Sequence, residues 1–343
     1  MSRNFPPSGF KLLDSSLRIE EETLPTYQAQ KYYPIQQGEI FNNRYQVLAK
    51  IGYGVTSTVW FGRDLVNCSY VALKIYVTGE KRDHELNIYR HMNSAEFKHP
   101  GKSLIRKLLD HFIITGRHGQ HICLVHEPLG ISASELLRSF PGNAVTLEDM
   151  KVCIRQLLIA LDFLHSVAGV IHTDLQLKNL LLPTPKPKAL FEFEEEELRM
   201  PSARKVLQDR TIYKSSRFPP GDGLPLLSDF GEARLGDEEH NEDIMPDPYR
   251  APEVILRENW DYKDDIGVHL SSVLWDNSGT WKGLAPVPDI TLESLAIDIR
   301  GEDKDGFLRW IRRALQWNSS DRPTALELFF SSENSIYCHL NIH

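Results

Sequence analysis

The pattern of apolar and polar residues changes near the middle of the chain. From Arg44, RYQVLAKIG alternates with the spacing of a strand and stops at glycine, and TVWFGRD and YVALKIYV continue as two more predicted strands. EKRDHELNIYRHMN predicts a helix whose apolar stripe holds Leu86, Tyr89 and Met92. HICLVHEPLG then predicts an apolar strand that ends at a Pro–Gly loop.

The clearest predicted helix begins after Thr146. Thr146 and Asp149 are spaced like a capping box in which Asp takes the usual place of Glu. Apolar residues then recur at helical spacing and predict a buried face: Met150, Ile154, Leu157, Leu158, Leu161 and Leu164. A strand-rich part followed by a helix-rich part predicts an α+β protein of two lobes, with an N-terminal extension at 1–40, an N-lobe and hinge at 41–129, and a C-lobe at 130–343.

Two segments lack this periodicity. Residues 1–40 mix Pro, Glu, Ser and Tyr, and we expect Tyr32 and Tyr33 to order part of them by packing on the main body. Residues 183–228 carry the acidic run FEFEEEELR between two Pro-rich stretches. We expect this insertion to be mostly mobile loop with its Glu run in solvent; a docking surface for arginine-rich peptides is the alternative.

Composition narrows the class of protein. The 343 residues are 41% apolar and 25% charged, as in soluble globular proteins with a large core. A net charge of −8 argues against nucleic acid as the main partner and suits a basic peptide, although such a charge also simply favours solubility. Four scattered cysteines without a CxxC pair predict reduced thiols in a cytoplasmic or nuclear protein and no zinc site. We find neither a secretory signal nor an apolar run of membrane length.

Two motifs in the predicted strands suit a phosphate ligand. In IGYGVTSTVW, Gly52 and Gly54 let a hairpin backbone approach phosphates closely, but Ser57 replaces a third glycine, so an ordinary glycine hairpin is an alternative. Lys74 lies inside an apolar strand and needs a partner, because burying an unpaired charge is costly. Glu85 is the candidate, and its spacing from Lys74 requires the helix to begin almost directly after the strand.

Three later motifs complete a set. HTDLQLKN brings an acid, a base and a metal-ligand type close together in the sequence, and SDFGEAR supplies Asp229. YRAPE follows about twenty residues later, and Arg322 is a candidate buried partner for Glu253. Five motifs of the right type in the right order leave coincidence negligible.

The set resembles the eukaryotic protein kinase signature over residues 41 to 330. YRAPE is similar to the group of cyclin-dependent and SR-protein kinases. Four further features resemble fungal relatives of SR-protein kinases: HTD with Thr173, the hinge CLVHEPLG, the insertion before DFG, and the lead-in YYPIQQGEIFNNRYQVLAKIGYGVTSTVW at 32–60. The resemblance implies a two-lobed protein kinase fold with ATP between the lobes. It also implies a monomeric Mg²⁺-dependent enzyme that phosphorylates Ser or Thr in proteins, Arg/Ser-rich splicing factors among them, and so regulates mRNA processing.

The resemblance also implies roles at matching positions. Asp174 would orient and deprotonate the substrate hydroxyl, Lys74 held by Glu85 would contact the phosphates, and Asn179 with Asp229 would hold Mg²⁺. Ile51, Val59 and Ala72 would line the adenine pocket. Glu127 and Leu129 would bind through backbone groups of the hinge, and His126 would be the gatekeeper with a steric role. The whole nucleotide-binding set is Ile51, Gly52, Tyr53, Gly54, Val55, Thr56, Ser57, Thr58, Val59, Ala72, Lys74, Glu127 and Leu129.

The chain departs from the family pattern in its catalytic loop. Gln176 replaces the lysine that neutralises γ-phosphate charge, and Lys178 either supplies that charge instead or points into solvent. Pro246 replaces the threonine that would meet the missing lysine, so both ends of one interaction have changed together. Thr173 replaces the Arg that receives an activation-loop phosphate.

Residues 231–250 contain no Ser or Thr to accept such a phosphate, which predicts constitutive activity. Acidic residues of this loop are a candidate substitute for the phosphate, but the sequence identifies no basic partner.

The segment after Asp265 departs furthest. Only about ten residues could be helical before the turn signal DNSG, so we expect a truncated anchor helix in the C-lobe. Loss of that much core could exceed the stability of a domain. A pseudokinase or nucleotide-binding scaffold, a small-molecule phosphotransferase and a non-functional truncated kinase are therefore the alternatives to an active protein kinase, although YRAPE with Arg322 argues against the phosphotransferase.

Overall fold

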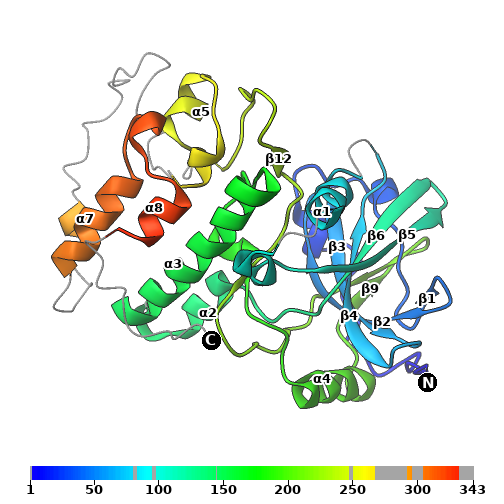
Figure 1. Cartoon of the computed structure of the whole chain (residues 1–343). Helices are drawn as coiled ribbons and strands as arrows, with labels where there is room; N and C mark the ends of the chain where they lie inside the picture. The colour runs from blue at the N-terminus through cyan, green and yellow to red at the C-terminus, as the bar shows by residue number, and fades with distance from the viewer. Residues whose placement is uncertain are drawn as a thin grey trace. The chain divides into compact units, whose positions relative to one another are not determined.

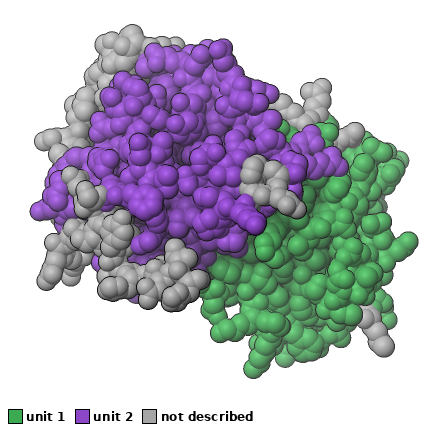
Figure 2. All heavy atoms as spheres, viewed as in Figure 1, with its two compact units in different colours: residues 1–86, 106–131, 181–223 green, residues 87–105, 132–180, 224–343 purple. Residues whose placement is uncertain are grey.

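The computed structural model of the chain describes residues 2–79, 83–94, 98–143, 145–246, 250–266, 292–295 and 304–331 (Figure 1). They divide into two compact units, coloured separately in Figure 2. The first unit comprises residues 1–86, 106–131 and 181–223, and the second comprises 87–105, 132–180 and 224–343. In space the insertion therefore belongs with the first unit, whereas the lobe boundaries along the chain stay a prediction.

The first unit is built on an antiparallel sheet of six strands among the described residues (Figure 1). Its strand order is β1-β2-β3-β4-β6-β5. The bounds are β1 Ile40–Phe41, β2 Tyr45–Tyr53, β3 Ser57–Asp64, β4 Ser69–Tyr76, β5 Leu108–Gly116 and β6 Gly119–His126. The four strands predicted from the apolar pattern, β2, β3, β4 and β6, are confirmed.

Strands β2 and β3 of this sheet are buried on both faces. Val47 and Trp60 pack into one cluster, while their neighbours Leu48 and Phe61 pack into another. Successive side chains of a strand point to opposite faces, so the two clusters lie on the two sides of the sheet.

The insertion is ordered, contrary to the expected mobile loop. It forms helix α4 Pro187–Arg199 and a hairpin of β9 Arg204–Val206 with β10 Thr211–Tyr213. The Glu run is only partly in solvent: Glu192, Glu195 and Glu196 are exposed, as expected. Glu194 is instead fully buried and accepts bonds from Arg63 at 2.9 Å, Arg3 at 3.2 Å and Tyr70 at 2.5 Å. These donors compensate for the removal of its charge from water, an arrangement that the local sequence does not reveal.

The N-terminal extension is also packed on this unit. It includes two short 3₁₀ segments, η1 Glu20–Thr23 and η2 Ala29–Lys31. Tyr32 is buried, and Tyr33 packs against the cluster that contains Val47. The prediction that these two tyrosines order the extension is confirmed.

Helices dominate the second unit. Helix α1 His84–Ser94 crosses the boundary between the units, and its Leu86, Tyr89 and Met92 are buried as predicted. The other helices are α2 Ala133–Ser139, α3 Leu147–Asp162, α5 Pro252–Leu256, α6 Leu292–Leu295, α7 Lys304–Ala314 and α8 Ala325–Phe329. The short strands are β7 Val170–Ile171, β8 Leu180–Leu181, β11 Leu226–Leu227 and β12 Arg234–Leu235. The last residue of β8, Leu181, begins the third segment of the first unit.

Helix α3 begins where its capping pattern predicts. Thr146 is the N-cap, and its hydroxyl accepts a bond from the Asp149 backbone N–H at 3.1 Å. The Asp149 carboxylate accepts from the Thr146 hydroxyl at 2.6 Å. Along the predicted apolar face, Leu158, Leu161 and Leu164 are buried.

The predicted truncation of the anchor helix falls at residues 267–291, which lie outside the described residues. The described chain reaches this point through the 3₁₀ segment η8 Tyr262–Asp265 and resumes at α6. Within the ranges given above, no helix is both long and apolar enough to cross a membrane.

Candidate active site

A buried ion pair joins β4 to the first turn of α1. The Lys74 ammonium on β4 donates to a carboxylate oxygen of Glu85 at 2.7 Å, and the Tyr76 hydroxyl donates to the same oxygen. Both ends of the pair are buried, as predicted. The helix does not follow the strand directly, since β4 ends at Tyr76 and α1 begins at His84; the pair forms because Glu85 is in the first turn of α1.

The glycine-rich hairpin connects β2 and β3. It is closed by a bond from the Gly54 N–H to the Ser57 carbonyl at 2.8 Å. Among the described atoms, a Cβ built on Gly52 would meet nothing nearer than Val59 at 3.7 Å, and one on Gly54 nothing nearer than Ser57 at 3.9 Å. The protein's own packing therefore does not require these glycines, and their bare backbone fits the close approach of a phosphate.

The predicted hinge follows β6. His126, the predicted gatekeeper, is buried, and its Nδ1 lies 2.9 Å from the Lys107 carbonyl oxygen. Directly after it, the Glu127 carbonyl accepts from the Leu129 N–H at 2.9 Å and from Arg106 at 3.2 Å. The two hinge groups predicted to bind adenine thus bond to each other in this structure, and a base would have to replace that contact.

The adenine-pocket positions lie on three neighbouring strands of the same sheet. Ala72 on β4 is buried and pairs with His126 of β6. Val59 on β3 pairs with Lys74, so the sheet register brings these predicted positions together. Ile51 on β2 packs against the cluster that contains Phe218 of the insertion.

Three side chains of the second unit converge on Asp174. Asn179 donates from Nδ2 to the Asp174 carboxylate and to its backbone carbonyl, both at 2.8 Å. Gln176, which stands where the lysine is missing, donates from Nε2 to the other carboxylate oxygen. The Lys178 ammonium lies 3.7 Å from the carboxylate, although its side chain is 58% exposed. Lys178 therefore carries its charge beside Asp174.

Asp265 holds the backbone of the loop that contains Asp174. This buried carboxylate accepts from the backbone N–H groups of His172 at 2.7 Å and Thr173 at 2.9 Å, and it pairs with His165 at 2.9 Å. Burial acts to raise the pKa of Asp265, but the bond and charge of His165, the charge of His172 and its backbone bond lower it overall. Sequence reasoning missed Asp265, since nothing in DYKDDIG separates it from surface acids.

The anchor holds a strained residue in place. Thr173 has a φ of 61°, a left-handed conformation that a β-branched residue rarely adopts. Its N–H is held by Asp265, and its hydroxyl donates to the Glu232 carbonyl at 2.5 Å. Strain of this kind costs about 1–3 kcal/mol and persists where surrounding bonds fix the backbone, as they do here.

The two candidate metal ligands, Asn179 and Asp229, are held close along the backbone. Ser228 donates to the Asn179 carbonyl through its N–H at 2.9 Å and its hydroxyl at 2.8 Å. Phe230 is fully buried, and its ring packs edge-on against Tyr89 at 5.4 Å and His172 at 5.0 Å. Asp229 between them has a φ of 67°.

This donor set fits Mg²⁺. Among the described residues, no group of three or more His, Cys, Asp or Glu side chains could hold a metal. Mg²⁺ instead binds through one or two carboxylates together with substrate phosphates and water. The Asp229 carboxylate and the Asn179 amide oxygen are hard oxygen ligands of the kind that this chemistry needs.

The segment after Asp229 contains the basic partner that the sequence did not identify. Arg234 donates to the Glu242 carboxylate at 2.8 Å. Burial acts to raise the pKa of Glu242, but the bond from Arg234 and nearby backbone bonds lower it overall. The Trp260 indole donates to the Glu242 backbone carbonyl at 3.0 Å. An acid of this loop thus bonds to an arginine of the same loop.

The predicted pair of Glu253 and Arg322 is confirmed. Arg322 is almost fully buried and makes a two-pronged contact with the Glu253 carboxylate, at 2.5 and 2.7 Å. Asp264 lies nearby, 3.9 Å from the Arg322 guanidinium. Burial, together with the charge and bond of Glu253, raises the pKa of Asp264 to about 9. The raised pKa of Asp264 favours its protonated form beside the ionised Glu253.

Comparison with known proteins agrees with this geometry. The protein kinase domain family matches residues 45–331. A serine/threonine protein kinase of Aspergillus fumigatus is 38% identical over 94% of this chain and 92% of its own length. The serine/threonine-protein kinase SRPK of Physarum polycephalum is 30% identical over 72% of this chain and 63% of its own length, and mouse SRSF protein kinase 3 is 33% identical over 48% and 30%. A solved kinase domain at 20% identity aligns with a TM-score of 0.62 over 88% of this chain and 98% of its own, which confirms the expected fold.

Proposed function

Because this chain belongs to the protein kinase family and its relatives are serine/threonine protein kinases, we propose that it transfers the γ-phosphoryl group of ATP to serine or threonine in Arg/Ser-rich proteins. Kinases of this family use ATP with a divalent metal and act on proteins; we propose Mg²⁺ as the metal here. The observation that carries the proposal is the Asp174 carboxylate, held in position by Asn179 and Gln176.

In the proposed mechanism, Asp174 is the residue that meets the substrate. Its carboxylate accepts the proton of the attacking hydroxyl and orients that oxygen toward the phosphorus. The Asn179 amide group donates one bond to the carboxylate and one to the Asp174 backbone carbonyl, which fixes the side chain relative to its own backbone. Asp265 holds the backbone of the same loop, so the base is positioned before substrate arrives.

In the first unit, Lys74 binds the α- and β-phosphates, and Glu85 with Tyr76 orients its ammonium. In the second unit, Asn179 and Asp229 would hold Mg²⁺. When bound, Mg²⁺ neutralises negative charge on the phosphates. The remaining positive charge at the γ-phosphate is assigned to Lys178, in place of the lysine replaced by Gln176.

Replacing Lys178 with Ala tests that assignment. We expect kcat on a peptide substrate to fall by about 10- to 100-fold, less than for a buried donor because the side chain is partly exposed to solvent. The measurement is steady-state transfer from radiolabelled ATP. Lys188→Ala, at an exposed lysine of α4, is the matched control and should keep wild-type turnover. Unchanged kcat in Lys178→Ala would mean that the charge is not used.

The preference for Arg/Ser-rich substrates is supported by relatives named as SR-protein kinases and by the charge of the segment after Asp229. Asp237, Glu238 and Glu239 are exposed there. The net charge of −8 acts in the same direction. Carboxylates in this position attract guanidinium groups and raise the local concentration of an arginine-rich peptide.

A peptide comparison tests the substrate class. We expect an Arg–Ser repeat peptide to be phosphorylated in preference to a Gly–Ser repeat of equal length. The double variant Glu238→Gln/Glu239→Gln should raise KM for the Arg–Ser peptide by about threefold or more, and less so at high salt. The exposed pair Glu192→Gln/Glu196→Gln on α4 is the control. Equal use of both peptides would contradict the substrate proposal, and ATP binding without transfer to either would favour a scaffold.

We further propose that the protein acts as a monomer in the cytoplasm or nucleus, with neither nucleic acid nor membrane as its main partner. The acidic charge and the reduced cysteines support this.

A further inference from the structure

The tip of the glycine-rich hairpin is bonded by the N-terminal extension. The Tyr32 hydroxyl lies 3.1 Å from the Gly54 carbonyl oxygen and 3.1 Å from the Val55 carbonyl oxygen. Tyr32 is 6% exposed, whereas Val55 at the tip is 54% exposed. A buried side chain from outside the hairpin, Tyr32, therefore bonds to the exposed tip of the hairpin.

This contact determines which way the peptide groups of the tip face. The described peptide bonds are all trans, and in a trans peptide the N–H points opposite to the carbonyl oxygen of the same plane. Because the carbonyls of Gly54 and Val55 face Tyr32, the following N–H groups, those of Val55 and Thr56, face away from it. Two successive N–H groups turned to one side form the kind of concave site that binds phosphate oxygens.

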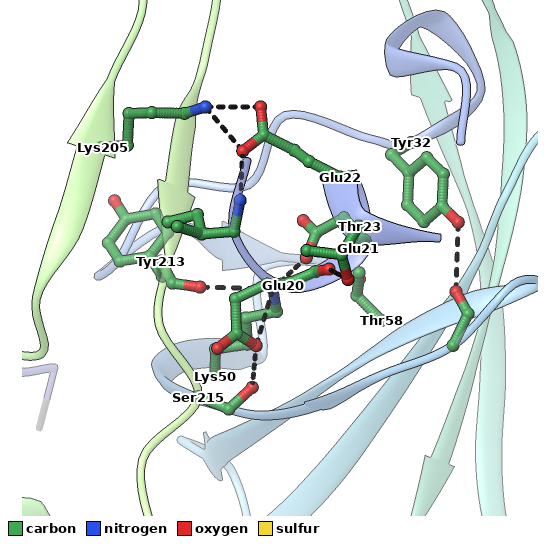
Figure 3. Close-up of polar contacts among 12 residues, drawn as sticks. Glu20, Glu21, Glu22, Thr23, Tyr32, Lys50, Thr58, Lys205, Tyr213 and Ser215 are labelled. Atoms are coloured by element: carbon green, nitrogen blue, oxygen red, sulfur yellow. Dashed lines mark hydrogen bonds and ion pairs between the residues drawn. The ribbon is translucent and has the colours of Figure 1, made fainter. Parts of the chain in front are cut away.

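The part of the N-terminal extension that precedes Tyr32 is held by buried ion pairs of η1, drawn in Figure 3. Glu22 of η1 bonds to Lys205 of the insertion at 2.5 and 2.6 Å. Glu21 of η1 pairs with Lys50 on β2. Lys50 also donates to the Tyr213 carbonyl at 3.2 Å. The extension, the insertion and β2 are therefore joined just before the hairpin.

The part of the extension next to Tyr32, residues 29–32, is held by hydrogen bonds to its backbone carbonyls. Arg210, in the turn between β9 and β10, donates to the Ala29 carbonyl, and its guanidinium lies 3.4 Å from the Tyr32 carbonyl oxygen. The Thr78 N–H, just after β4, donates to the Lys31 carbonyl at 2.9 Å. These contacts hold the backbone at and before Tyr32 and so restrict movement of its ring away from the hairpin.

Tyr32 stays a hydrogen-bond donor over the working pH range. Burial raises its pKa to about 12, and the nearby charges of Glu21 and Tyr27 act in the same direction. The phenol is therefore neutral at pH 7, and its O–H can be shared between the two carbonyl oxygens.

We propose that Tyr32 is a positioning residue for the phosphate-binding loop: its hydroxyl holds the carbonyls of Gly54 and Val55 so that the loop's N–H groups are turned outward for the phosphates of ATP. The proposal rests on the proposed function, since it takes ATP as the ligand. It assigns a role to the N-terminal extension, which supplies part of the preorganisation of the nucleotide site.

Tyr32→Phe removes this hydroxyl and keeps the buried ring. We expect the Kd of ATP, measured by calorimetry with Mg²⁺ present, to rise about three- to tenfold, the effect of one lost hydrogen bond. The Kd of adenosine, which has no phosphate, should stay unchanged. KM for ATP should rise while kcat changes little, and amide exchange of residues 52–57 should become faster.

Tyr33→Phe is the matched control. It removes the neighbouring hydroxyl, which donates to the Glu39 carboxylate at 2.8 Å and not to the hairpin tip. We expect wild-type affinity for both ligands and wild-type exchange at residues 52–57. Both variants should keep a melting temperature close to that of the wild type, because each ring remains in its packing site.

The outcomes separate the two proposals. Unchanged ATP affinity in Tyr32→Phe, or an equal loss for ATP and adenosine, would overturn the role of Tyr32 in presenting the loop to phosphates. A wild-type protein that binds ATP but transfers no phosphate would contradict the proposed function alone, and the Tyr32 comparison would still be decided by binding.

Discussion

Asp174→Asn is expected to lower phosphoryl transfer by about 10²- to 10⁴-fold, the contribution of a positioned general base. Asn is nearly isosteric with Asp but cannot accept the substrate proton. Asn179 retains its 2.8 Å bond to the residue 174 backbone carbonyl, so the loop should keep its shape. ATP binding and thermal stability should therefore be close to wild type, and the loss should appear in kcat rather than in KM for ATP.

The measurement is transfer from radiolabelled ATP to an Arg–Ser repeat peptide under single-turnover and steady-state conditions. Asp222→Asn, at an exposed carboxylate of the insertion, is the matched control and should retain full activity. Equal transfer rates for wild type and Asp174→Asn would contradict the proposed role of Asp174 as the general base. ATP-dependent thermal stabilisation without turnover in the wild type would then point to a nucleotide-binding scaffold.

Glu253→Ala is expected to give the largest loss of stability, about 3–5 kcal/mol. The variant removes the partner of the Arg322 guanidinium, which is 1% exposed and cannot return to water without unfolding. Partial compensation is available, because Asp264 can ionise 3.9 Å away once Glu253 is gone. Urea unfolding measures the difference, and Glu258→Ala, at an exposed position just past α5, should stay within about 0.5 kcal/mol of wild type. A small loss in Glu253→Ala would mean that the pair is dispensable.

The raised pKa of Asp264 predicts that the stability of the protein depends on pH. The pKa of Asp264 is raised from 3.8 to about 9 by burial and by Glu253. Between these values the folded protein binds a proton that the unfolded chain has released, so this group's contribution to stability falls as pH rises. Asp264→Asn keeps a donor for Glu253 without titrating. We therefore expect its unfolding free energy to decline less than that of wild type between about pH 5 and about pH 8.

Several parts of the active site were predictable because their chemistry is local in sequence. Lys74 could be paired with Glu85 because a charge inside an apolar strand requires a partner, and one acid stood on the next helix. The capping of α3 at Thr146 and the burial of Leu86, Tyr89 and Met92 followed from short-range periodicity. The loop containing Asp174 was recognisable from the spacing of its residues alone.

Other features depend on contacts between residues far apart in the chain. The Glu run of the insertion was expected in solvent, yet Glu194 is buried because Arg3, Arg63 and Tyr70 reach it from distant segments. Asp265 was missed for the same reason, since its partners lie about ninety residues earlier. The residues next to a carboxylate in the sequence do not show whether distant residues will donate hydrogen bonds to it in the folded protein. The burial of these carboxylates could therefore not be predicted.

The sequence by itself determined the lobe pattern, the catalytic loop and the family to which they belong, because strand and helix periods and motif spacing are properties of consecutive residues. Only the tertiary structure decided what surrounds them. It placed Lys178 beside Asp174, paired Arg234 with Glu242, and brought Tyr32 of the N-terminal extension onto the glycine-rich hairpin. The physical reason is that hydrogen bonds and ion pairs act over a few ångströms, and only the folded chain brings their partners within that distance.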